Sequence, residues 1–212
     1  MLTTRYKALL NRWLEPLGRA VARNGIAPSA LTLATPLLGA LVCLWVLRTR
    51  AILPFCFLIT AVGCLDGLDG AVARAGGRVT KFGAYLDAVC DRAFEAMVAI
   101  TGAALTGYWG LAMGVLTGSF LVSYAKARAA MEVSVSNQEW PDLMERTERG
   151  VLFVAGLAAG AVLPWRPLGR DGFWWTLVLL NVLIDVTVAQ RVLRARQLIE
   201  SRSALSEFDP PN

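Results

Sequence analysis

Histidine is absent from the 212-residue chain, and its four cysteines form no CxxC pair. Structural zinc sites draw mainly on these two residue types, and a disulfide scaffold needs paired cysteines. We therefore exclude both kinds of site. Charged residues are also scarce, at 17% of the chain against roughly 25% in an ordinary soluble domain. This scarcity is typical of a membrane protein.

Apolar residues make up 56% of the chain and gather in six runs. A bilayer core about 30 Å thick needs roughly 20 helical residues, a length that the runs approach with their weakly polar flanks. Strands are a poor alternative, because the runs lack the alternation that a transmembrane barrel requires. We predict an all-α integral membrane protein with six transmembrane helices, over residues 31–47, 51–65, 93–105, 111–122, 151–163 and 173–188.

The N-terminal segment predicts an amphipathic helix on the membrane surface. Leucines and aromatic residues recur there at helical spacing, with basic residues between them. A cap that packs on the protein itself is the alternative. We expect one membrane-embedded domain over 1–212, with the amphipathic helix at 1–27, the six-helix bundle at 28–200 and a flexible tail at 201–212.

Basic residues are distributed unevenly between the predicted loops. Most of the 21 lie next to span ends that would share one side of the membrane, and only Arg48, Arg50, Arg166 and Arg170 lie on the other. The positive-inside rule then places both termini in the cytoplasm of a multi-pass plasma-membrane protein. The net charge of +5 follows mostly from this topology, and it also favours attraction to acidic membrane lipids. Nothing in the sequence indicates a nucleic-acid partner.

Four carboxylates gather between the second and third predicted spans. Asp66 and Asp69 are three residues apart, and Asp87 and Asp91 are four apart, so each pair shares a helix face. The connector is short enough to make the two helices antiparallel neighbours, and the pairs can face each other. Such a cluster needs a cation, and oxygen ligands favour Mg²⁺, with Mn²⁺ as an alternative, over zinc or copper. Ion pairs with nearby arginines, which would only hold the bundle together, are the structural alternative.

Glycines between the two acidic pairs suit a diphosphate ligand. Gly67 and Gly70 permit close backbone approach beside Asp69, and Gly83 does the same one turn before the second pair. Arg74 supplies positive charge. We therefore expect phosphate oxygens at the acidic cluster.

A group of basic residues lies at the ends of the later predicted spans, on the predicted cytoplasmic side; we call it the basic group. Several Lys and Arg residues at the level of a cation site favour an acceptor that carries its own phosphate. Ordinary positive-inside charge is the alternative. The group consists of Lys126, Arg128, Arg146, Arg149 and Arg191.

The stretch from Asp66 to Asp91 reads D-x-x-D-G-x-x-A-R-x8-G-x3-D-x3-D. It resembles the signature of the CDP-alcohol phosphotransferases, membrane enzymes that transfer a phospholipid group from a CDP-activated lipid to an alcohol and release CMP. The resemblance implies that Asp66, Asp69, Asp87 and Asp91 ligate the metal and that Asp91 is also the general base. It further implies a CDP-lipid site made of Asp66, Gly67, Asp69, Gly70, Ala73, Arg74, Thr80, Gly83, Asp87, Pro28, Leu31 and Thr32.

Three further stretches, GAYLDAVCDRAFEAMV, SYAKARA and ERTERGVLF, look like the phosphatidylinositol phosphate synthase branch of this family and its archaeal-lipid counterpart, archaetidylinositol phosphate synthase. The resemblance implies inositol 1-phosphate as acceptor and CDP-diacylglycerol or CDP-archaeol as the activated lipid. It also implies that the acceptor phosphate is bound by Lys126, Arg128, Arg146 and Arg191.

Other functions and assemblies stay open at this point. Glycerol 3-phosphate as acceptor would give a phosphatidylglycerophosphate synthase. A divalent-cation transporter is a remote alternative, because apart from the acidic cluster the spans offer little polar lining beyond Asp185. The glycine-rich run 156–162 suits a homodimer face or internal packing equally well.

Overall fold

The computed structural model describes residues 16, 18–21, 23, 27–77, 79–133 and 143–208, with side chains up to residue 202. Within these ranges the chain is helical apart from short connections, and it has no β-strand. The all-helical prediction is confirmed. Of the predicted amphipathic segment, residues 16, 18–21 and 23 are described and helical, and Ala27 is the extended residue that precedes α2; the rest of that segment lies outside the described part.

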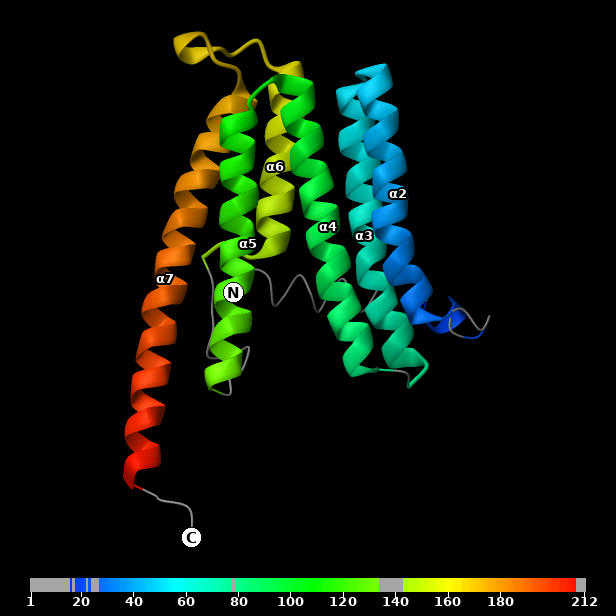
Figure 1. Ribbon diagram of the computed structural model, residues 1–212. Coiled ribbons are helices and arrows are strands. Elements are labelled where there is room, and N and C mark those ends of the chain that lie inside the picture. The colour runs from blue at the N-terminus through cyan, green and yellow to red at the C-terminus, as the bar shows by residue number, and fades with distance from the viewer. Residues whose placement is uncertain are drawn as a thin grey trace. The chain divides into compact units, whose positions relative to one another are not determined.

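The first compact unit, Met1–Thr101, contains α2 (Pro28–Thr49), α3 (Ile52–Ala75) and most of α4 (Lys81–Thr106). Proline at the start of α2 suits a position whose N–H has no partner within the helix. At the other end Arg50 adopts a left-handed conformation and donates its N–H to the Val46 carbonyl at 2.7 Å. The sharp stop lets α3 return directly alongside α2 (Figure 1).

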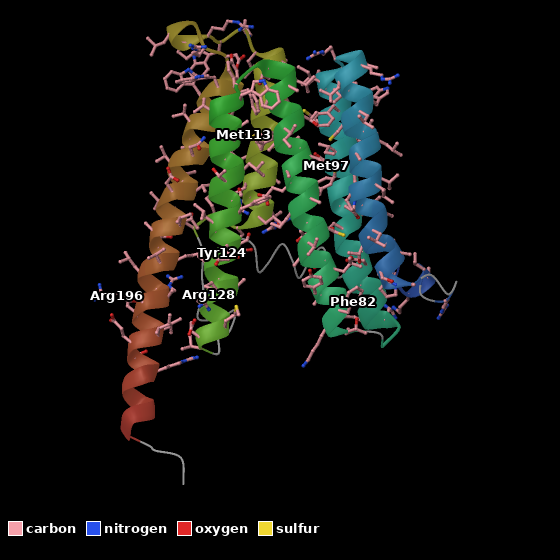
Figure 2. All side chains as sticks on the ribbon, in the orientation of Figure 1. Phe82, Met97, Met113, Tyr124, Arg128 and Arg196 are labelled. Atoms are coloured by element: carbon pink, nitrogen blue, oxygen red, sulfur yellow. The ribbon has the colours of Figure 1, made fainter. Side chains whose placement is uncertain are left out.

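The helices of the first unit approach closely at a glycine. A Cβ added to Gly39 of α2 would lie 2.7 Å from Cε2 of Phe94 on α4. One turn further along α2, the buried Cys43 lies with its Sγ 3.9 Å from the carbonyl oxygen of Met97, which is labelled in Figure 2. Gly39 therefore lets the Phe94 ring seal the contact between α2 and α4.

The second unit, Gly102–Asn212, contains the end of α4 and the later helices. These are α5 (Trp109–Glu132), α6 (Arg146–Val162), the short 3₁₀ turn η1 (Pro167–Gly169) and α7 (Gly172–Phe208). Helix α7 packs along both α5 and α6, and Figure 1 shows it beside α5. Glycines again mark the close contacts, with Gly118 of α5 against Ile184 and Gly156 of α6 against Thr176.

Side-chain caps fix where α6 and α7 begin. At α6 the Glu148 side chain accepts the backbone N–H of Glu145 at 3.0 Å, and Glu145 caps the first turn in return. At α7 the Asp171 carboxylate accepts the N–H of Trp174 at 3.0 Å and the hydroxyl of Tyr108 at 2.9 Å. The second bond ties the start of α7 to the turn before α5.

Among the residues that the structure describes, three helices are long and apolar enough to cross a membrane: Pro28–Thr49, Ile52–Ala75 and Gly172–Arg202. The other helices do not meet this criterion of length and apolar composition, for reasons that their sequences show. Helix α4 carries four charged residues within residues 87–95, α5 is diluted by glycine, serine and threonine, and α6 has only 17 residues. The three apolar helices nevertheless describe a multi-pass membrane protein.

Helix α7 is longer than the apolar run that predicted it. It continues to Phe208, so residues 201–208 of the expected tail are helical. An ion pair between Arg196 and Glu200, at 2.7 Å and one turn apart, supports this extension beyond the apolar part. The predicted boundary at residue 200 does not coincide with the end of the helix.

Candidate functional site

The last turns of α3 hold the first two carboxylates of the signature. Asp66 is half-buried and Asp69 is buried. Although the two residues lie one turn apart, their carboxylates lie near different helices. The Asp66 carboxylate lies near acidic residues of α4, and the Asp69 carboxylate accepts a hydrogen bond from α2. The two acids of this pair are therefore not equivalent.

The first half of α4 supplies the other two carboxylates, Asp87 and Asp91, both half-buried. One oxygen from each of these residues and one from Asp66 all lie within 4.8 Å of one another. Figure 1 shows the connected ends of α3 and α4 that hold these residues. The predicted convergence of the two acidic pairs is thus observed for three of the four carboxylates.

The donor set of this cluster fits a hard divalent cation. Three carboxylate oxygens converge from two helices, and like charges at this spacing repel unless a cation lies between them. Oxygen-only ligation with few carboxylates is the pattern that Mg²⁺ and Mn²⁺ accept, completing their shell with water or phosphate. The residues present therefore fit such an ion.

Asp69 does not belong to this three-oxygen group of the described residues. Its Oδ2 accepts the hydroxyl of Thr32 at 2.6 Å, and its Oδ1 accepts the N–H of Gly70 at 2.5 Å. The Thr32 hydroxyl also lies 3.1 Å from the Pro28 carbonyl of its own helix. The structure thus brings one residue predicted for the CDP-lipid site into direct contact with one predicted for the metal.

The other residues predicted for the CDP-lipid site lie around the connection between α3 and α4. The Arg74 side chain lies over Gly70, since a Cβ added to Gly70 would be 3.2 Å from Nη1 of Arg74. Thr80 accepts the N–H of Gly83 at 2.9 Å and so caps the start of α4. Gly67 lies exposed and Ala73 half-buried on α3, and Pro28 and Leu31 lie half-buried in the first turn of α2.

The residues predicted to bind the acceptor phosphate belong to the second unit. Arg128 is exposed near the end of α5 and pairs with Glu132 at 2.6 Å, while Lys126 is half-buried. Arg146 occupies the first position of α6. Arg191 on α7 is buried and donates through Nη1 to the Val122 carbonyl of α5.

The sequence placed Arg149 in the basic group and allowed an ion pair between Asp91 and a nearby arginine, but it did not indicate the contacts that these residues make. On α4, Arg92 lies 3.4 Å from Glu95 and 4.0 Å from Asp91, which places an ion pair directly beside the acidic cluster. On α6, Arg149 is buried and donates to the Met144 carbonyl at 3.0 Å. Glu95 follows Asp91 at helical spacing, and this pattern could have identified it.

Known proteins resemble the chain over most of its length. It is 35% identical to archaetidylinositol phosphate synthase of Pyrococcus horikoshii over 190 residues, which cover 88% of this chain and 93% of the relative. It is 32% identical to phosphatidylinositol phosphate synthase of Mycobacterium marinum over 203 residues, or 88% of this chain and 80% of the relative.

Solved structures show the same fold. The crystal structure of Mycobacterium tuberculosis phosphatidylinositol phosphate synthase with CDP-DAG bound matches with a TM-score of 0.74 and 26% identity, covering 87% of this chain and 94% of the other. The same enzyme in complex with manganese and citrate also matches with a TM-score of 0.74 and 26% identity, covering 86% of this chain and 88% of the other. A divalent metal is therefore a known component of a related protein.

The family itself follows from the chain as a whole. Residues 25–188 match the family described as CDP-alcohol phosphatidyltransferase. They include the complete acidic signature and every member of the basic group except Arg191. The resemblance predicted from Asp66 to Asp91 is confirmed. The chain is a member of the CDP-alcohol phosphatidyltransferase family.

Proposed function

We propose that this protein transfers a phosphatidyl-type group from a CDP-activated lipid to a hydroxyl of inositol 1-phosphate, releasing CMP. The observation that carries the proposal is the convergence of Asp66, Asp87 and Asp91 within an unbroken family signature. The relatives from Pyrococcus and Mycobacterium, both named as inositol phosphate lipid synthases, support the choice of acceptor. Family membership favours this reaction over cation transport.

The chemistry assigned to the acidic residues is a phosphoryl-type transfer. Asp91 accepts the proton of the acceptor hydroxyl, whose oxygen bonds to the lipid-side phosphorus as the bond to CMP breaks. Asp66, Asp69, Asp87 and Asp91 would hold Mg²⁺ or Mn²⁺, and a related enzyme has been crystallised in complex with manganese. Such an ion, when bound, would neutralise diphosphate oxygens and make CMP a better leaving group.

We assign the CDP-lipid site to the signature and to the start of α2. Arg74 carries charge suited to a diphosphate, and its side chain already lies over Gly70. Thr80 holds the start of α4 by capping Gly83, so the backbone there is fixed before a ligand binds. The assigned residues are Asp66, Gly67, Asp69, Gly70, Ala73, Arg74, Thr80, Gly83, Asp87, Pro28, Leu31 and Thr32.

We assign the acceptor phosphate to Lys126, Arg128, Arg146 and Arg191. A guanidinium binds phosphate through two parallel hydrogen bonds, so three arginines and a lysine suit a phosphomonoester and not serine or choline. Arg146 lies at the N-terminus of α6, where the helix dipole adds to its charge. Glycerol 3-phosphate carries the same group and is the competing acceptor.

The membrane arrangement that we propose has six spans in the plasma membrane, with both termini and the active site in the cytoplasm. The uneven distribution of basic residues supports it. We propose that residues 1–27 form the amphipathic surface helix, and that 1–212 functions as one membrane-embedded domain. Helices α4, α5 and α6 would complete the six spans.

We propose a homodimer for the assembly, but the two glycines of the run 156–162 give it no separate support. Gly156 and Gly160 of that run face Thr176 and Phe173 of α7, which accounts for them by internal packing. Mass photometry of the purified protein tests the proposal, and a single species of monomer mass would refute it.

The decisive test of the function is CMP release by the purified protein in detergent. CDP-diacylglycerol and CDP-archaeol are each offered with Mg²⁺ and one of four acceptors: inositol 1-phosphate, glycerol 3-phosphate, inositol or serine. Release with inositol 1-phosphate alone is expected. Release only with glycerol 3-phosphate would keep the reaction and change the acceptor, whereas silence in every combination would reject the proposed function.

A further inference from the structure

The hydrogen bond between Thr32 and Asp69 joins two helices inside the first unit. Thr32 lies on α2 and Asp69 on α3, 37 residues apart in sequence, and their Oγ1–Oδ2 distance is 2.6 Å. Both residues are buried, with 4% and 7% of their surface exposed. A bond this short between a hydroxyl and a carboxylate is of the strong, charge-assisted kind.

The Thr32 hydroxyl lies near two hydrogen-bond acceptors, which differ in distance and in charge. The Pro28 carbonyl lies 3.1 Å from the Thr32 oxygen, which is the ordinary contact of a threonine with its own helix. The Asp69 oxygen is nearer, at 2.6 Å, and carries charge. Because a threonine has one hydroxyl proton, we take Asp69 as its principal acceptor.

This bond restricts how the carboxylate can turn. Thr32 holds Oδ2 from the side of α2, and the Gly70 N–H holds Oδ1 from the backbone of α3. A carboxylate held at both oxygens keeps one rotamer and one plane. Asp66, one turn earlier on the same helix, instead meets Asp87 and Asp91.

We propose that Thr32 is a positioning residue that sets the orientation of Asp69 for the divalent cation. The proposal rests on the proposed function, because that function makes Asp69 a metal ligand. It gives Thr32 a role that does not require contact with the nucleotide. Groups that orient a metal ligand typically change metal affinity by roughly 10–100-fold when they are removed.

The test compares three single variants in direct Mn²⁺ binding. Thr32→Val removes the hydroxyl at nearly constant side-chain shape, whereas Thr32→Ser keeps a hydroxyl and removes only the methyl group. Thr35→Val is the matched control, because Thr35 is equally buried on the same helix but its hydroxyl contacts the Leu31 carbonyl of its own helix, at 3.4 Å. Binding is followed by the EPR signal of free Mn²⁺, with purified protein in detergent and without lipid or acceptor.

We expect Thr32→Val to weaken Mn²⁺ binding by about 10-fold or more, and Thr32→Ser to recover most of that loss. Thr35→Val should bind Mn²⁺ as the parent protein does. In an Asp69→Asn background, Thr32→Val should add less than about twofold, because the two changes then remove the same interaction. Melting temperatures of the metal-free variants check that each is folded.

Other outcomes would overturn the inference in distinguishable ways. If Thr32→Val leaves Mn²⁺ binding unchanged but weakens binding of a CDP-lipid without metal, Thr32 contacts the nucleotide and does not position Asp69. Equal losses for Thr32→Val and Thr35→Val would assign the effect to packing of α2. If the parent protein binds no Mn²⁺, the metal site of the proposed function fails, and the role of Thr32 fails with it.

Discussion

At Asp91, an amide substitution can separate proton acceptance from structural support. Asparagine keeps the size of aspartate and one of its oxygens, but it cannot take a proton from the acceptor hydroxyl. The side chain lies at the acidic cluster on α4, beside the pair formed by Arg92 and Glu95. Its neighbours are therefore expected to hold the substituted residue in place.

Asp91→Asn should lower CMP release by at least about 100-fold while CDP-lipid binding persists. Asp185→Asn is the matched control, since it makes the same chemical change at an exposed carboxylate of α7. Turnover and binding of the CDP-lipid are measured on the same preparations. Equal losses in both quantities would show that Asp91 serves mainly the metal or the structure.

Arg128→Ala should raise the KM for the phosphorylated acceptor by about 10-fold and change kcat less, because an ion-assisted hydrogen bond to phosphate is lost. Arg196→Ala is a close control. Arg196 pairs with Glu200 at 2.7 Å, just as Arg128 pairs with Glu132 at 2.6 Å, and both arginines are labelled in Figure 2. An unchanged KM for Arg128→Ala would remove this residue from the acceptor site.

At the scale of elements, the packing of helices depends on small residues at defined positions. Gly39→Ala would place a Cβ 2.7 Å from Cε2 of Phe94, so the ring or the helix must move. Overpacking of this kind costs about 1–3 kcal/mol, and we expect a lower melting temperature in detergent. Gly110→Ala, where nothing lies within 4 Å of the added carbon, should not reduce it. If the double variant Gly39→Ala with Phe94→Leu regains the melting temperature of the parent, the contact between position 39 and the Phe94 ring is confirmed. An unaltered melting temperature for Gly39→Ala alone would refute it.

The bond from Tyr108 to Asp171 predicts a pH dependence of stability. Partial burial, with the hydrogen bond and charge of Asp171, raises the pKa of the Tyr108 hydroxyl above its ordinary value of 10.0. The neutral phenol is therefore favoured in the folded protein. Its stabilising contribution is present below pH 10 and is lost as the pH rises through the raised pKa.

Melting temperatures of the parent and Tyr108→Phe check this expectation between about pH 8 and pH 11. The parent should melt a few degrees higher than the variant at the acidic end, and the difference should shrink above about pH 10. Curves that stay parallel over the whole range would show that ionisation of Tyr108 does not affect folding. Far-UV circular dichroism would confirm that the variant remains helical.

The elements could be predicted from the sequence more fully than their contacts. Each apolar run overlaps one helix from α2 to α7, because a long stretch of apolar, helix-favouring residues can be recognised from composition alone. The end of α7 was missed because Phe208 lies far beyond the apolar residues, after a polar part in which one ion pair, between Arg196 and Glu200, supports the helix. The bond from Thr32 to Asp69 could not be predicted, since it depends on the register of two helices and not on either pattern alone.

For the whole molecule, a local signature established more than the overall composition did. Apolar content indicates a membrane protein, whereas eight fixed positions between Asp66 and Asp91 match the signature of a family and through that resemblance indicate a reaction. The acceptor is harder to predict. Lys and Arg near span ends can orient the protein in the membrane or bind phosphate. The presence of a residue such as Lys126 therefore does not distinguish these two roles.

The orientation of the chain in the membrane is a property of the whole molecule that a pair of insertions can test. A reporter enzyme active only outside the cytoplasm is inserted after Asn137, in the loop predicted to be cytoplasmic, or after Gly169, in the turn between α6 and α7 on the opposite side. We expect activity only from the insertion after Gly169, because the basic residues near the first site hold it inside. The reverse result would place Asp66 and its neighbours outside the cytoplasm, away from any supply of CDP-activated lipid made there. CMP release by each fusion would show whether the enzyme is still folded, so that a silent reporter is not mistaken for a cytoplasmic one.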